Sequence, residues 1–113
     1  MPASHASGNQ TAVIATEYTL TGSAITAAGS YELNFSLDAM EKSDELNITI
    51  EKRIAGGAAS VVAYDRSYAD AQGEPLVIGI PVTVSDAANA SVTFKFTQTA
   101  GTGRNFVWEI TAL

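Results

Sequence analysis

Apolar and polar residues alternate one by one along several stretches of this chain. The most regular stretch is 31–37, where Tyr31, Leu33, Phe35 and Leu37 are separated by polar residues. Because successive side chains of a β-strand point to opposite faces, this pattern predicts a strand with one buried face. The same pattern, less regular in places, predicts strands at 11–20, 24–28, 45–54, 60–68, 91–98 and 105–113, and a further run from Leu76 that stops at Pro81 and that Val82 and Val84 could continue after a bend.

The last third of the chain has the strongest pattern. Its two apolar faces consist of Val92, Phe94 and Phe96, and of Phe106, Trp108, Ile110 and Ala112. Residues 99–104 between them contain two glycines, which a tight connection accommodates easily. The interpretation is an antiparallel hairpin, each arm of which needs an opposing layer on its apolar face.

About eight short strands in 113 residues, with no convincing amphipathic helix, predict an all-β fold. We expect a single antiparallel β-sandwich, and jelly-roll and Ig-like connections both fit the strand count. The first ten residues are small and polar, which divides the chain into an extended N-terminal arm, 1–10, and a β-sandwich domain, 11–113. Pro81 has no N–H to donate, so it predicts a strand end, an edge or a bulge.

Charge and composition remove several classes of function. The net charge is −6 and the six basic residues are scattered, whereas a nucleic-acid groove or an anionic membrane surface calls for clustered positive charge. There is no cysteine, and no apolar run approaches the roughly 20 residues of a membrane-spanning helix. The N-terminus lacks the basic and apolar regions of a signal peptide. We therefore expect neither a nucleic-acid nor a membrane partner.

Residues that could carry chemistry are few. The only histidine, His5, lies on the predicted arm, so no nucleophile–base pair suggests itself. Carboxylates gather at Asp38, Glu41, Asp44 and Glu45, and more loosely at Asp65, Asp70 and Glu74. Their spacing is not that of a calcium loop, so solvated acidic loops are the preferred interpretation. No catalytic residue, metal ligand or cofactor is predicted, although an acid pair of a glycosidase could be distant in sequence.

Two further groups of residues are candidates for binding. Tyr18, Tyr64, Tyr68 and Trp108 could line a sugar-binding face, although rings at strand spacing more often pack in a core. Residues 101–104 resemble a phosphate loop only faintly, because strands flank them on both sides. The residues expected to contact a partner chain are Pro2, His5 and Gln10 on the arm, and Arg104 after the second glycine.

Three segments resemble a family of small proteins encoded in tailed-bacteriophage genomes. They are the alternating strand 31–37, the strand 46–54 with its Gly56–Gly57 turn, and above all residues 98–108, Gln-Thr-Ala-Gly-Thr-Gly-Arg-Asn-Phe-Val-Trp. The resemblance extends from about Leu20 to the end of the chain and does not include the arm. It implies a virion structural protein without catalytic residues to carry over.

The leading hypothesis is therefore a non-enzymatic capsid decoration, or cement, protein located in the virion. Its expected partners are the major capsid protein or other virion subunits, together with copies of itself in a symmetric homo-oligomer, for which a trimer is one arrangement. The alternative is a host-glycan-binding module of a phage tail, baseplate or fibre. A glycosidase is a more distant third hypothesis.

Overall fold

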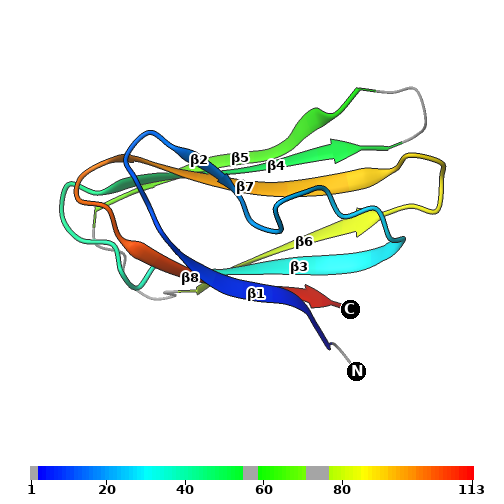
Figure 1. The fold of residues 1–113 in the computed structure, drawn as a ribbon, viewed down its shortest axis with the longest axis horizontal. Coiled ribbons are helices and arrows are strands. Elements are labelled where there is room, and N and C mark those ends of the chain that lie inside the picture. Colours follow the sequence, from blue (N-terminus) through cyan, green and yellow to red (C-terminus); the bar gives the residue numbers. More distant parts are fainter. Residues whose placement is uncertain (1–2, 55–58, 71–76) are drawn as a thin grey trace.

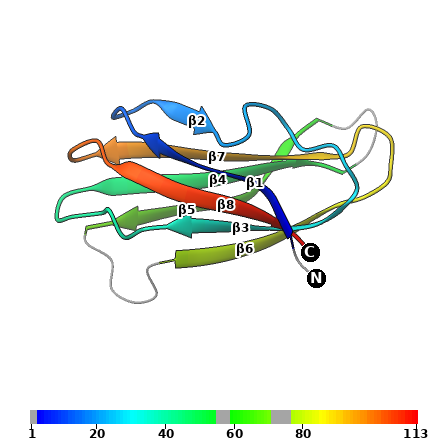
Figure 2. The same ribbon diagram turned by 60° about the horizontal axis from the view of Figure 1, so that its bottom comes forward.

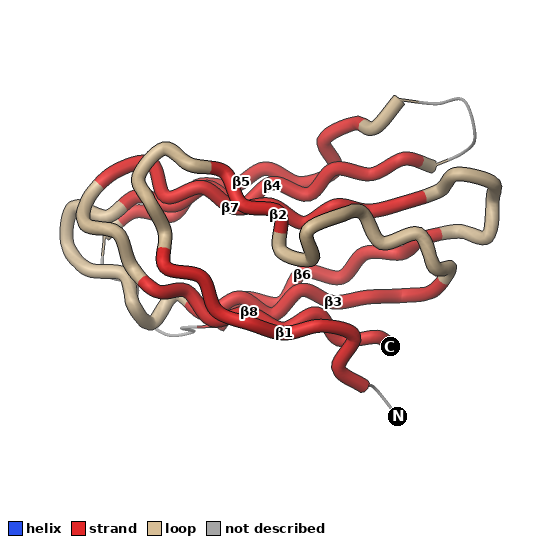
Figure 3. The backbone as a smooth tube through the Cα atoms, in the orientation of Figure 1, coloured by secondary structure: helices blue, strands red, loops and turns tan. Residues whose placement is uncertain are grey.

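Two antiparallel sheets face each other across one core (Figure 1). A computed structural model describes residues 3–54, 59–70 and 77–113, and Figure 3 shows these residues as strands and connections without a helix. The strands are β1 (Ala3–Thr11), β2 (Glu17–Thr19), β3 (Gly29–Ser36), β4 (Glu45–Arg53), β5 (Val61–Ala69), β6 (Val77–Val84), β7 (Ser91–Ala100) and β8 (Asn105–Ala112). Sheet A has the order β1-β8-β3-β6, and sheet B has the order β2-β7-β4-β5.

The strand order is that of a jelly roll. The chain passes from one sheet to the other after every strand except β4, which forms a hairpin with β5 (Figure 2). An Ig-like domain instead keeps several consecutive pairs of strands within one sheet. The predicted all-β sandwich of eight strands is confirmed, and of the two connection types the sequence left open, the structure has the jelly-roll type.

The core consists of the inward side chains of both sheets. Phe35 of β3, Phe96 of β7 and Phe106 of β8 are fully or almost fully buried, with ring centroids 5.2–5.7 Å apart. Because Phe96 comes from sheet B and the other two from sheet A, these rings join the two layers. Edge contacts between aromatic rings add about 0.5–1.5 kcal/mol per pair to the free energy gained by their burial.

Most strands predicted from alternation are present. Strands β3, β4, β5, β7 and β8 lie within a residue or two of the predicted ranges, and the inward residues of β7 and β8 are those predicted. Pro81 lies inside β6 and pairs with Glu32. Since β6 is an edge strand, the missing N–H is tolerated there, and of the three predicted roles of Pro81 the edge is the one observed. The predicted turn at residues 55–58 lies outside the described residues.

The predicted hairpin of residues 91–113 is wrong. Strand β7 pairs with β2 and β4 in sheet B, whereas β8 pairs with β1 and β3 in sheet A. Residues 101–104 therefore cross from one sheet to the other. Alternation identifies which face of each strand is buried, but two strands facing each other across a core show the same pattern as two neighbours in one sheet.

The segment expected to form an arm outside the sandwich is a strand of it. Strand β1 pairs antiparallel with β8 from Ala3↔Ala112 to Thr11↔Asn105. Gly8 lies against the indole of Trp108, where a Cβ would come within 3.2 Å of Cζ2. The sequence of β1 shows no apolar alternation because its less exposed positions are occupied by Ala6, Gly8 and Gln10, and main-chain hydrogen bonds to β8 hold the strand.

The strand predicted at 11–20 is also corrected. Residues 12–16 form a corner between the sheets, in which Ala12 is buried and Ala15 has a positive φ of 65°. Only the three residues of β2 then pair with β7. The predicted strand at 24–28 is reduced to a single bridge between Ile25 and Val92.

Candidate functional site

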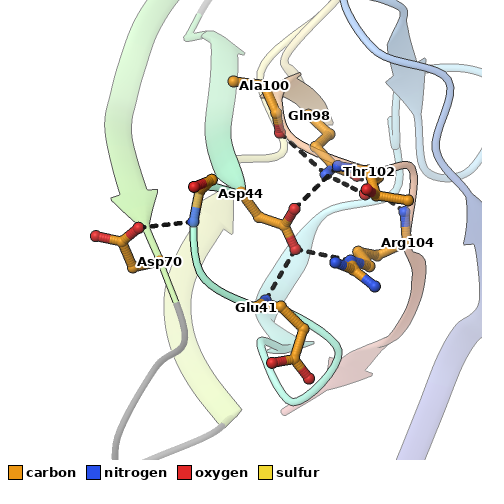
Figure 4. A network of polar contacts seen from close by, with 8 residues as sticks. Glu41, Asp44, Asp70, Gln98, Ala100, Thr102 and Arg104 are labelled. Atoms are coloured by element: carbon orange, nitrogen blue, oxygen red, sulfur yellow. Dashed lines mark hydrogen bonds and ion pairs between the residues drawn. The ribbon is translucent and has the colours of Figure 1, made fainter.

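The most extensive polar cluster lies at the end of the sandwich where β7 leads to β8 (Figure 4). At its centre is Asp44, whose side chain is 1% exposed. Its Oδ2 accepts hydrogen bonds from the Nε of Arg104 at 2.7 Å and from the backbone N–H of Glu41 at 2.8 Å. Its Oδ1 accepts one from the backbone N–H of Thr102 at 3.1 Å. The carboxylate therefore joins the β3–β4 connection to the β7–β8 connection.

A buried amide completes this cluster. Gln98, fully buried in β7, donates to the carbonyl oxygens of Ala100 and Thr102, and its Oε1 accepts from the backbone N–H of Arg104. These hydrogen bonds give partners to main-chain groups of the crossing between the sheets, which is not part of either sheet. Neither Asp44 nor Gln98 was singled out by sequence for this role. The available signal for Gln98 was a polar residue at an inward position of a strand, whereas Asp44 lies in a connection and gave no such signal.

Both glycines of the 101–104 connection are close to other parts of the chain. Gly101 has a φ of 93°, and a Cβ there would lie 2.1 Å from Oδ1 of Asp44. A Cβ on Gly103 would lie 2.3 Å from the carbonyl oxygen of Ala12. The two glycines are thus required by close packing, of Gly101 against Asp44 and of Gly103 against Ala12, which accounts for them without a phosphate ligand.

Electrostatics support a structural role for this cluster. Burial alone would raise the pKa of Asp44, but the hydrogen bonds from Glu41, Arg104 and Thr102 and the charge of Arg104 hold that pKa below its ordinary value. The carboxylate is therefore ionised at neutral pH and occupied by donors of its own chain. Asp44, together with Gln98 and Arg104, thus holds the β3–β4 and β7–β8 connections together, and these three residues are called the polar lock below.

The residues predicted to contact a partner are spread along the molecule. His5 is exposed on β1 and packs edge-on against Tyr31, with ring centroids 5.2 Å apart. Gln10, near the other end of β1, donates to the carbonyl of Thr11. The Nε of Arg104, which was also predicted to contact a partner chain, contacts Asp44 of its own chain. Pro2 lies outside the described residues, and partner contacts by these residues stay a prediction.

The structure brings Asp70 of the second predicted acidic set beside Asp44 of the first, whose backbone carbonyl accepts from the N–H of Asp70 at 2.8 Å, and it divides the predicted aromatic row. Among residues 3–54, 59–70 and 77–113, no three acidic or histidine side chains are placed to share a metal ion. Tyr18 stacks on Phe96 with centroids 5.3 Å apart, and Trp108 is 8% exposed in the core. Tyr64 and Tyr68 alone share a site, where their hydroxyls are 2.9 Å apart. The four rings therefore do not form one sugar-binding face.

Two adjoining hollows run along the side of the sandwich where β5 and β6 are the outer strands. One, of about 540 Å³, is lined by Tyr64, Arg66 and Tyr68 of β5 and by residues 77–81 of β6. The other, of about 400 Å³, is lined by Lys52, Ala63 and residues 81–83 among others. Together they are called the β5–β6 groove below. Sequence alternation did not find it, because a groove between the edges of two sheets depends on how the sheets stack.

The edge at β1 differs from the other three edges of the two sheets. Natural sheets protect their edges with short strands, charged side chains, proline or bulges. Strand β2 has only three residues, β5 contains Asp65, Arg66 and a bulge, and β6 contains Pro81. The nine residues of β1, Ala-Ser-His-Ala-Ser-Gly-Asn-Gln-Thr, contain no Lys, Arg, Asp, Glu or Pro. Beyond the irregularity between Ser4 and Ala6, β1 is an unprotected edge.

Comparisons with known proteins give little further information. No protein-family model matches the sequence, and no curated protein does. Among solved structures, the chain is similar to a chain in "Structure of infectious bursal disease virus Gt strain", with 17% identity and a TM-score of 0.42. The match covers 99% of this chain but 31% of that chain, and at this level it carries no argument about function. In the described part of the chain, no helix is long and apolar enough to span a membrane.

Proposed function

We propose that this protein is a non-enzymatic virion structural protein that binds the head of a tailed phage as a decoration, or cement, subunit. The observation that carries the proposal is the uncharged outer edge of the nine-residue strand β1, which is regular beyond the irregularity between Ser4 and Ala6. Such an edge is a template for another chain, and proteins that keep one exposed usually cover it with a partner. The resemblance of residues 98–108 to proteins of phage genomes supports the virion as the location.

The proposal assigns the β1 edge to the capsid. A capsid subunit would add a strand to sheet A beside β1, with His5 and Gln10 at the contact, so that main-chain hydrogen bonds supply much of the affinity. Many identical weak contacts over a shell then act together to stabilise it. The jelly-roll order by itself does not select this function, since lectin domains and capsid domains both use it.

The test uses heads of the encoding phage assembled without this protein. The wild-type protein is expected to co-sediment with these heads and to raise the temperature at which they release DNA. The Asn9→Lys variant places a charge on the exposed side of β1 and should bind at least about 10-fold more weakly. Thr99→Lys adds the same charge to an exposed position of β7, an interior strand, and should bind as the wild type does.

Two results would overturn the proposal. One is folded wild-type protein that neither binds nor stabilises the heads. The other is equal binding by both lysine variants, which would mean that the β1 edge takes no part.

A further inference from the structure

The β5–β6 groove carries positive charge that forms no ion pair among the residues the structure describes. The ammonium of Lys52 donates to the Oγ1 of Thr83 at 3.3 Å, and the guanidinium of Arg66 lies 5.5 Å from the ring centre of Tyr68. In the described part of the chain, neither side chain makes an ion pair, and no Asp or Glu lines either hollow. By contrast, Lys95 on the outer face of sheet B lies 3.0 Å from Glu51 and 3.6 Å from Glu17.

The outer face of sheet A has the opposite charge. The four strands of this sheet contain no Lys or Arg, and Glu32 of β3 and Glu109 of β8 point outward. Neither carboxylate makes an ion pair among the described residues. Beside Glu109 lies a shallow hollow of about 310 Å³, whose walls include Val77 and Val107. Both valines are more than half exposed.

We infer that copies of this protein associate head to tail, with the β5–β6 groove of one copy against the outer face of β8 and β3 of the next. Charge decides between this contact and a symmetric one. Two grooves facing each other would oppose Lys52 and Arg66 to their own copies, and two sheet A faces would oppose carboxylates. Only groove against face brings opposite charges together, and it also covers Val77 and Val107, the exposed valines of the sheet A hollow.

Shape is consistent with this contact. Strand β5 stands out from the body, and Val61, which pairs directly with Lys52, is 60% exposed. Placing Val61 in the hollow between Val77 and Val107 would bring Lys52 towards Glu109. The contact joins two surfaces of the chain that meet at Val77, which lines both, so it repeats from copy to copy and closes into a ring when the rotation permits. Ser7 of β1 also lines this hollow, but the outer main-chain edge of β1 takes no part in the contact.

This inference goes beyond capsid binding, because it concerns the isolated protein in solution. Two double variants test it. Lys52→Glu with Arg66→Glu reverses the charge of the β5–β6 groove, and Glu32→Lys with Glu109→Lys reverses the charge of the outer face of sheet A. The fourfold variant combines both and has the same net charge as the wild type. Sedimentation equilibrium of each protein over a range of concentrations, at low and high salt, measures self-association, with circular dichroism as the control for folding.

The wild type is expected to form oligomers that weaken with salt, each double variant should associate at least about 100-fold more weakly, and the fourfold variant should recover association. A wild-type monomer at about 0.1 mM would overturn the inference, as would a fourfold variant that stays dissociated. A mixed oligomer of wild type and groove-reversed protein in which grooves pair with each other would overturn it too. A protein that self-associates but does not bind capsids would contradict the proposed function and leave this inference standing. A protein that binds capsids but does not self-associate would contradict this inference alone.

Discussion

The Nε atom of Arg104 lies 2.7 Å from the Oδ2 atom of Asp44, sixty positions earlier in the chain. Arg104 ends the connection between β7 and β8, and Asp44 ends the connection between β3 and β4. The contact therefore fastens the crossing between the two sheets to a neighbouring connection, with both partners largely withdrawn from water. It gives the residues around Arg104 a structural role, because they hold the crossing between the sheets in place.

Replacing Asp44 by alanine should destabilise the fold strongly. The change leaves the N–H groups of Glu41 and Thr102 and the guanidinium of Arg104 without their acceptor. We expect the free energy of unfolding to fall by about 2–4 kcal/mol, measured by urea denaturation. Glu41→Ala is the matched control, because it removes an exposed carboxylate of the same connection and should change stability by less than about 0.5 kcal/mol. Equal effects of both variants would contradict the assigned role of Asp44.

The same carboxylate should make stability depend on pH in the acid range. Its pKa in the folded protein is below the ordinary value of 3.8, so the ionised form favours folding. This contribution is fully present above the unfolded pKa and is lost as the pH falls through the folded one. The difference in unfolding free energy between wild type and Asp44→Asn should therefore be largest near neutral pH and shrink below about pH 4. A constant difference across this range would contradict the prediction.

Gly101→Ala should be much more harmful than Gly22→Ala. Both glycines have positive φ, 93° and 75°, which costs an alanine about 1–2 kcal/mol. A Cβ at Gly22 meets nothing within 4 Å, whereas one at Gly101 would lie 2.7 Å from the Cα of Asp44. We expect losses of about 1 kcal/mol at Gly22 and about 3–5 kcal/mol at Gly101, measured by thermal and chemical unfolding. Similar losses at both positions would mean that the approach to Asp44 is not as close as described.

Gly8→Val tests whether β1 belongs to the sandwich in solution. The added side chain would press on Trp108, the only tryptophan, so its emission should shift and the protein should lose about 1–3 kcal/mol of stability. Ser7→Val, at the neighbouring exposed position, is the control and should leave the emission unchanged. If Gly8→Val has no effect on either observable, β1 does not lie against Trp108.

The sequence by itself determined where most strands lie and which of their faces is buried. The alternation in 31–37, 45–54 and 91–98 is a local property, since one apolar face per strand is enough to produce it. The absence of clustered positive charge and of cysteine could also be read directly. The alternation predicted an all-β sandwich, but every way of connecting the strands of such a sandwich shows the same alternation.

Only the tertiary structure decided the connections, the role of β1 and the polar lock. Strands β7 and β8 look like a hairpin in sequence because two faces that meet across a core alternate just as neighbours in a sheet do. Strand β1 has no apolar alternation, and main-chain hydrogen bonds to β8, which no side-chain pattern reveals, place it in sheet A. Asp44 and Arg104 meet because the crossing between sheets brings two connections together. Pairing between distant segments depends on the packing of the whole chain, so the alternation of apolar and polar residues within one segment does not predict it.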